Sequence, residues 1–150
     1  MRELELTTTR RRVLGAAVAR ILPSDDGPGA RETGVAEYIV GALAERMNRH
    51  NIPLFERGLD FLEVLAQGRA SREFCSCSPS QQDEILREAQ EFPNNDARRF
   101  FAQLVLLSLE GFLCDPQHGG NQGHLGWRYL GLSPEGVQLG NCTKEPSWRT

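Results

Sequence analysis

The chain has 150 residues and a formal net charge of −3, with 17 lysine and arginine residues against 20 acidic ones. A chain of this length normally folds as one domain around one core, and its acidic balance lacks the excess of positive charge that sequence-independent binding of nucleic acid needs. No apolar run approaches the ~20 residues that a membrane-spanning helix requires, and four cysteines are too few and too unevenly spaced for a disulfide scaffold.

The first predicted element combines three arginines with an apolar stretch. Thr9–Ala19 reads TRRRVLGAAVA and resembles a twin-arginine export signal, but Arg20 interrupts the apolar stretch before any small-residue cleavage site. At helical spacing the same stretch places six apolar side chains on one stripe: Val13, Leu14, Ala17, Val18, Ile21 and Leu22. Thr8 or Thr9 is then the N-cap and Pro23 the stop. The helical interpretation favours an uncleaved, cytoplasmic chain, and the alternative is export by the twin-arginine route with a partner.

Two further helices are predicted from apolar side chains at helical spacing. Residues 24–34, SDDGPGARETG, are polar and rich in turn formers, so we expect a surface loop between the first helix and the second. The second helix begins near Thr33 and ends at Asn51-Ile52-Pro53, and the third follows that break and ends at Gly68. The apolar residues that define them are Val35, Ile39, Leu43 and Met47 in the second, and Phe55, Leu59, Leu62 and Ala66 in the third.

The segment Ser78-Pro79-Ser80-Gln81 predicts the start of a fourth helix. Ser78 can accept a hydrogen bond from a free backbone N–H while Gln81 reaches back, which is the pattern of a capping box. Pro79 occupies the first helical position, where its missing N–H costs nothing. Pro93 closes this helix, whose apolar residues are Ile85, Leu86, Ala89 and Phe92.

The fifth predicted helix is the most apolar one. Asp96 is expected to cap it, and it continues to Cys114, because Asp115 precedes a proline and is biased away from helical geometry. Only a narrow polar strip interrupts its apolar circumference, formed by Arg99, Gln103 and Glu110. A helix that is apolar on most sides is usually buried, so we expect this helix to lie at the centre of the fold.

These segments predict an all-α fold. We expect a compact bundle of about five helices, followed by a Gly-rich loop and an irregular C-terminal tail. No strand alternation, internal repeat or low-complexity tract is evident. The helical domain is assigned to residues 1–132 and the tail to residues 133–150.

The loop after the fifth helix is unusually rich in residues with special backbone freedom. Gly119, Gly120 and Asn121 belong to the residue types that most readily take positive φ, and further glycines follow. Trp127 closes the loop, and its large ring with a single N–H donor suits a partly buried anchor. The sequence therefore predicts a rigid, irregular loop whose shaping or partner-binding residues are Asp115, Pro116, Gly119, Gly120, Asn121, Gly126 and Trp127.

Two segments together carry a resemblance to a known family. Leu109–Leu132 reads LEGFLCDPQHGGNQGHLGWRYLGL, and it resembles the signature of the gluconate 2-dehydrogenase subunit 3 family, in which a helix leads into a DPxxGGN loop and then a GW pair. Arg20–Ile39 reads RILPSDDGPGARETGVAEYI and is similar to the first helix, acidic turn and second helix of that family. The resemblance spans most of residues 10–132.

The resemblance implies a small accessory subunit without a cofactor or catalytic residues of its own. Members of this family accompany a large FAD-containing oxidoreductase of the glucose-methanol-choline type, which oxidises sugars, sugar acids or related alcohols. The small subunit is thought to assist the folding of the large one, and a cytochrome c subunit can complete the complex. In many systems the small subunit carries a twin-arginine signal, from which the short segment at Arg10–Arg12 departs.

The alternative hypothesis is a small metal-binding or redox protein that acts on its own. Its candidate ligands are Cys75, Cys77, Cys114, Cys142, His118 and His124. Zinc sites usually take ligands in C-x2-4-C pairs, and the C-x-C pair at Cys75 and Cys77 is one residue too tight. No nucleophile or carboxylate accompanies the histidines at convincing spacing, and the Gly-rich turn lacks the Lys and Ser/Thr of a phosphate-binding loop.

Overall fold

The computed structural model describes residues 6–133 of the chain. Within that range the protein forms seven α-helices and no strand, which confirms the all-α prediction. The helices are α1 (Thr8–Ile21), α2 (Ala30–Thr33), α3 (Val35–Ala44), α4 (Ile52–Ala70), α5 (Pro79–Glu91), α6 (Asn95–Leu113) and α7 (Leu125–Tyr129). The five longer helices correspond to the five predicted ones. Apart from Ser133 the predicted tail, with Cys142, lies outside the described residues.

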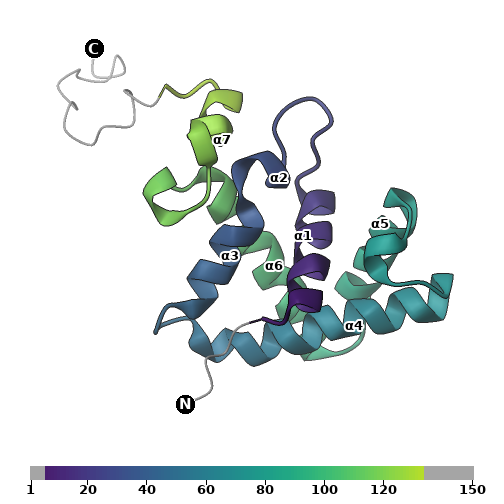
Figure 1. Ribbon diagram of the computed structural model, residues 1–150. Helices are drawn as coiled ribbons and strands as arrows, with labels where there is room; N and C mark the ends of the chain where they lie inside the picture. Colours follow the sequence, from purple (N-terminus) through teal and green to yellow (C-terminus); the bar gives the residue numbers. More distant parts are fainter. Residues whose placement is uncertain (1–5, 134–150) are drawn as a thin grey trace, which may run out of the picture.

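The longer helices pack around α1, which contacts α2, α3, α4, α5 and α6. Figure 1 shows α1 near the middle of the molecule, with α4 running across its N-terminal end and α2 and α7 side by side near the other end. The helix α6 contacts α1 to α5 and also receives α7 at its C-terminal end. Among the described helices, none combines the length and the hydropathy needed to cross a bilayer.

Aromatic side chains fill the core between α4 and α6. Phe55 and Phe100 are fully buried, and their rings meet edge to face with centroids 5.4 Å apart. A β-carbon at Gly58 would overlap the Phe100 ring, so this glycine lets the two helices approach closely. The inner face predicted for α4 is buried at every position: Phe55, Leu59, Leu62 and Ala66.

The predicted capping box of α5 is confirmed. The Gln81 backbone N–H donates to Ser78 Oγ at 3.3 Å, and the Ser78 N–H donates to Gln81 Oε1 at 2.9 Å. Two other predicted N-caps were placed too far along the chain. The side chain of Thr7 caps α1 and that of Asn94 caps α6, since Asn94 Oδ1 accepts from the N–H groups of Asp96 and Ala97. Asp96 instead lies in the first turn, where its charge complements the helix dipole.

Helix ends also differ from the prediction at two places. The helix α4 continues past Gly68 to Ala70, and Ser71 ends it in the left-handed conformation. Gly68 does not take a positive φ and so does not terminate the helix. The helix α3 ends at Ala44, since the side chain of Asn48 donates to the carbonyl of Ala42 and terminates the helix. Met47 therefore lies beyond the helix and is 85% exposed, contrary to the prediction that it joins the apolar face.

The predicted surface loop 24–34 contains the short helix α2. Gly29 precedes it, and Glu32 reaches back to accept from the Gly29 N–H at 2.8 Å. Gly34 then takes the left-handed conformation, with φ 72°, and joins α2 to α3. The sequence pattern does not predict this helix, because four residues are too few to show helical periodicity.

Candidate functional site

The loop 115–127 folds back onto the C-terminal end of α6. Asp115 Oδ1 accepts from the N–H of Gln117 at 3.0 Å, and Pro116 opens the 3₁₀ turn Pro116–His118. That turn ends at Gly119, whose φ of 94° lies in the region that favours glycine. These residues reverse the chain, so the segment that follows meets the last turn of α6.

Asn121 is the centre of this arrangement. It is fully buried and takes the left-handed conformation, with φ 44°. Its backbone N–H donates to the carbonyl of Gly111 at 2.7 Å, and its Nδ2 donates to the carbonyl of Cys114 at 2.9 Å. Its Oδ1 accepts from the N–H of Gly126 at 2.8 Å. One side chain thus ties the start of α7 to the end of α6.

Two glycines allow the loop to approach the α6 backbone. A β-carbon at Gly120 would overlap the carbonyl oxygen of Gly111, and one at Gly126 would overlap that of Phe112. Both glycines are buried and have ordinary φ values, so space and not backbone conformation requires them. Gly119 meets the opposite condition, since its backbone requires glycine while a β-carbon there would have space.

Trp127 completes the contact with α6. Its indole Nε1 donates to the carbonyl of Leu113 at 2.8 Å, and only 8% of the residue is exposed. The ring of His124 lies against it, with centroids 5.1 Å apart. The last four carbonyls of an α-helix have no partner within the helix, and here Asn121 and Trp127 supply donors to three carbonyls at the end of α6.

The two segments that carried the family resemblance meet in space. The side chain of Gln122 covers the backbone of Gly34, and the ring of Tyr129 covers that of Gly27; a β-carbon at either glycine would overlap these side chains. Tyr38 lies against Gly111 in the same way and also donates its hydroxyl to Glu110 at 3.3 Å. Burial, together with the Glu110 carboxylate, raises the pKa of Tyr38 to about 12, so its hydroxyl remains a donor.

One face of α6 is apolar and is left exposed by the rest of residues 6–133. Leu106, Leu109 and Leu113 are 48%, 45% and 40% exposed, and Ala102 continues the same stripe one turn earlier. The expectation that α6 is buried around most of its circumference is therefore wrong for this face. The other side of the helix does pack into the core through Phe100, Leu104 and Leu107. We call the stripe Ala102, Leu106, Leu109 and Leu113 the α6 face.

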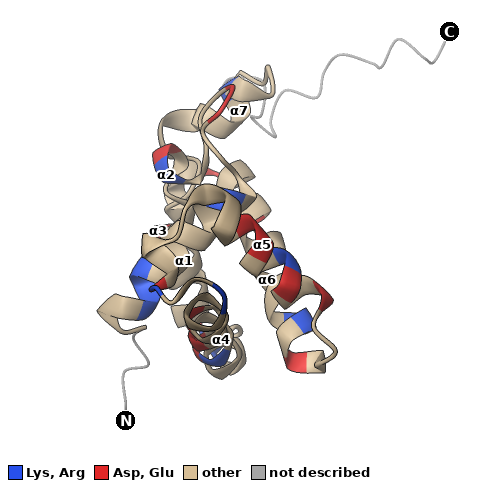
Figure 2. Cartoon of the chain, turned by 90° about the vertical axis from the view of Figure 1, so that its right-hand side faces the viewer, with Lys and Arg blue, Asp and Glu red and all other residues tan. Residues whose placement is uncertain are grey.

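Two shallow hollows lie along α6 where it meets the end of α1. One, of about 270 Å³, is lined in part by Ile21, Phe101 and Val105. The other, of about 250 Å³, lies between the 22–28 segment, Phe112 and Tyr129. Charged residues also border these hollows: Arg20, Asp83 and Arg87 line the first, and Asp25 and Asp26 line the second. Figure 2 shows charged residues along α4 and α5, among other places, while the ribbon of α7 is largely uncharged.

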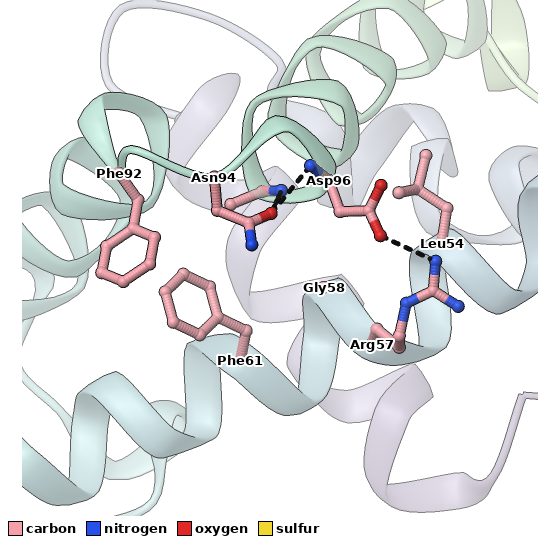
Figure 3. Close-up of a pocket in the computed structure, with 8 residues that line it drawn as sticks. Leu54, Arg57, Gly58, Phe61, Phe92, Asn94 and Asp96 are labelled. Atoms are coloured by element: carbon pink, nitrogen blue, oxygen red, sulfur yellow. Dashed lines mark hydrogen bonds and ion pairs between the residues drawn. The ribbon is translucent and has the colours of Figure 1, made fainter.

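A third hollow, of about 200 Å³, lies between α4 and the turn that precedes α6. Figure 3 shows Phe61 and Phe92 facing each other at one end of it and Arg57 reaching Asp96 at the other. The two rings are 4.8 Å apart, and the ion pair spans 3.1 Å. The amide oxygen of Asn94 is occupied in capping α6. Arg57 and Asp96 pair with each other, and no nucleophile or histidine lines this hollow, so it offers an apolar recess and no convergent catalytic set.

The cysteines and histidines of the alternative hypothesis do not converge in the described part of the chain. Residues 6–133 contain no group of three or more His, Cys, Asp or Glu side chains arranged to hold a metal ion. Burial raises the pKa of the thiols of Cys75, Cys77 and Cys114, which disfavours the thiolate that a nucleophilic cysteine needs. The fourth candidate cysteine lies outside the described residues.

The α6 face and the contacts of Gln122 and Tyr129 were not predicted from the sequence. A signal for the face was present, because positions 102, 106, 109 and 113 repeat at steps of four, three and four on the side opposite the buried stripe. A helix with two apolar stripes has more apolar surface than one core can cover. No local pattern marks Gln122 or Tyr129, whose partners lie about a hundred residues earlier in the chain.

Comparison with known proteins identifies the family. A family model described as gluconate 2-dehydrogenase subunit 3 matches residues 8–134, which is most of the chain. The matched range begins at the first residue of α1 and includes every described helix. Neither a curated protein nor a solved structure matches.

Proposed function

The chain belongs to the gluconate 2-dehydrogenase subunit 3 family, and from this premise we propose that it is a non-catalytic accessory subunit. In this proposal it binds and stabilises a large FAD-dependent sugar or alcohol dehydrogenase or oxidase of the glucose-methanol-choline type. A cytochrome c subunit is an optional third component. The family name itself implies a complex with other dehydrogenase subunits.

The observation that carries the proposal is the exposed α6 face. Its four positions run for about 16 Å along the helix, at 1.5 Å per residue. Three leucines in line on α6 form a contiguous apolar surface, whereas single exposed apolar residues are ordinary. A partner that covers such a surface stabilises the subunit, because apolar area is removed from water. Obligate interfaces are accordingly more apolar than transient ones.

We assign the large dehydrogenase subunit as the occupant of the α6 face. Between Arg99 and Asp115 the only charged residue on α6 is Glu110, and that residue accepts from Tyr38. Arg20, near the hollow at Val105, is paired with Asp83 at 2.7 Å. A partner surface that fits the α6 face is therefore apolar, with bulky side chains for the two hollows and polar groups at their rims, where Arg87, Asp25 and Asp26 lie.

In this proposal the loop 115–127 acts by shaping the surface and not by catalysis. Asn121 and Trp127 point inward and hold the last turn of α6, which carries Leu113. The exposed side chains of Tyr129, Leu130 and Leu132 follow directly after the loop and extend the apolar surface at that end. Asp115 and Gly119 are exposed and give the reversal its form.

The proposal locates FAD and the substrate pocket in the partner. Dinucleotides are commonly bound at a strand, a glycine-rich turn and a helix N-terminus. The described residues include no strand, so residues 6–133 do not supply this unit. In this chain the Gly-rich loop is occupied with the carbonyls of α6.

Co-purification from the native host tests the proposal. A tagged full-length chain is expected to bring down a much larger protein at fixed stoichiometry, and that protein should release FAD on denaturation. The isolated chain should give no turnover of sugars, sugar acids or alcohols with an artificial electron acceptor. A monodisperse chain without a flavoprotein, or turnover by the isolated chain, would overturn the proposal.

A further inference from the structure

The apolar stretch that follows the three arginines lies in the centre of the fold, while Arg11 and Arg12 are exposed at its start, and the segment has a role that the proposed function does not include. Its apolar residues Val13, Leu14, Ala17 and Val18 are each at most 1% exposed. They belong to α1, which packs against five other helices. The stretch that resembles the apolar core of an export signal is therefore part of the hydrophobic core of the protein.

Both ends of α1 are held by arginine ion pairs. Arg10 bridges to α4: its Nη1 contacts Glu56 at 2.9 Å, while its Nε and Nη2 contact the two carboxylate oxygens of Asp60 at 3.0 and 2.8 Å. Arg20 forms the same two-pronged contact with Asp83 of α5, at 2.7 and 2.9 Å. Planar guanidinium groups make such contacts and lysine cannot reproduce them.

We infer that residues 8–21 are a permanent structural helix, that Arg10 and Arg20 lock it onto α4 and α5, and that folding makes this twin-arginine pattern unreadable as an export signal. A receptor that reads Arg10, Arg11 and the following apolar stretch as an exposed segment must first withdraw α1 from the core. Cleavage after α1 would remove the helix on which the other long helices pack. If the assembled complex is exported, its signal therefore lies outside residues 8–21.

The first test follows the chain in its native host. We expect the intact mass of the purified protein to include residues 8–21, and the variant Arg10→Lys/Arg11→Lys to have the same subcellular distribution as the wild-type chain. Lysine keeps the charge but removes the twin arginines. A purified chain that begins after Ile21, or a shift of the double variant to another compartment, would overturn the inference.

The second test measures the locking contacts by unfolding the isolated chain in urea, independently of any partner. In a double-mutant cycle of Arg10→Ala and Asp60→Ala, we expect a coupling of about two- to fivefold in the unfolding equilibrium constant. The same coupling is expected for Arg20→Ala with Asp83→Ala. Arg46→Ala, at an exposed position beyond α3, is the control and should change little. Additive effects in both cycles would show that the arginines do not hold α1.

Discussion

The indole N–H of Trp127 donates to the backbone carbonyl of Leu113, 2.8 Å away and fourteen residues earlier in the chain. This bond closes the loop that begins at Asp115 and anchors it to α6. Trp127→Phe keeps an aromatic ring and removes the donor, so we expect the free energy of unfolding of the isolated chain to fall by about 1–3 kcal/mol. Urea denaturation measures this change. An unchanged midpoint would mean that the loop does not depend on this anchor.

Asn121 offers a sharper test, because its side chain both donates and accepts. Asn121→Asp keeps the shape but removes the donor to the Cys114 carbonyl and places a buried carboxylate beside that oxygen. We expect a loss of at least ~3 kcal/mol in unfolding free energy. Asn95→Asp is the matched control, since an exposed acidic residue in the first turn of α6 complements the helix dipole. Equal effects of the two changes would contradict the capping role of Asn121.

Two glycine-to-alanine changes test whether Gly126 is required because there is no space for a side chain. At Gly126 an alanine would overlap the carbonyl of Phe112, so Gly126→Ala should destabilise the protein markedly. At Gly68, within α4, a β-carbon meets nothing within 4 Å, and Gly68→Ala should stabilise it by up to about 1 kcal/mol. Thermal unfolding of both variants is the measurement. A neutral Gly126→Ala would show that α7 does not pack directly on the end of α6.

The Arg10 ion pair predicts a dependence on pH. The hydrogen bonds and charge of Arg10 hold the pKa of Asp60 below its ordinary value of 3.8. A carboxyl whose pKa is lowered by folding stabilises the folded state above its unfolded pKa, and this contribution is lost as the pH falls through the folded value. Asp60→Asn should therefore lose less stability than the wild type when the pH falls from neutral to about 3. Urea unfolding across that range measures the difference.

The Arg10→Ala background is the control for this prediction. If the pair is the source of the effect, Asp60→Asn should no longer alter the acid dependence once Arg10 is absent. Parallel stability curves for the wild type and Asp60→Asn would show that Asp60 does not have its lowered pKa in the folded protein.

Much of the fold follows from periodicity and turn chemistry. The inner face of α4 and the capping box at Ser78 are local patterns, and both occur where the sequence places them. Helix ends were less accurate because they depend on which nearby side chain reaches a free backbone group. Asn94, and not Asp96, accepts the N–H groups at the start of α6. The side chain of Asn48 bonds the carbonyl of Ala42, so α3 ends before it reaches Met47.

The site was harder to predict because its contacts join distant segments. The run of glycines pointed to a loop of fixed shape, but only the fold shows that Gly120 and Gly126 face the carbonyls of α6. The apolar circumference of α6 led to the expectation that it is buried, although no element within residues 6–133 covers its outer side. That excess of apolar surface is the physical reason for proposing a partner.

The most direct measurement is co-purification of the large flavoprotein by variants of the α6 face. Leu106→Ser/Leu109→Ser replaces two exposed side chains, so the isolated chain should unfold within about 0.5 kcal/mol of the wild type, while recovery of the flavoprotein should fall at least tenfold. Val64→Ser, at a 65% exposed position on α4, is the control and should retain the complex. Full recovery with the α6 double variant would contradict docking through this face.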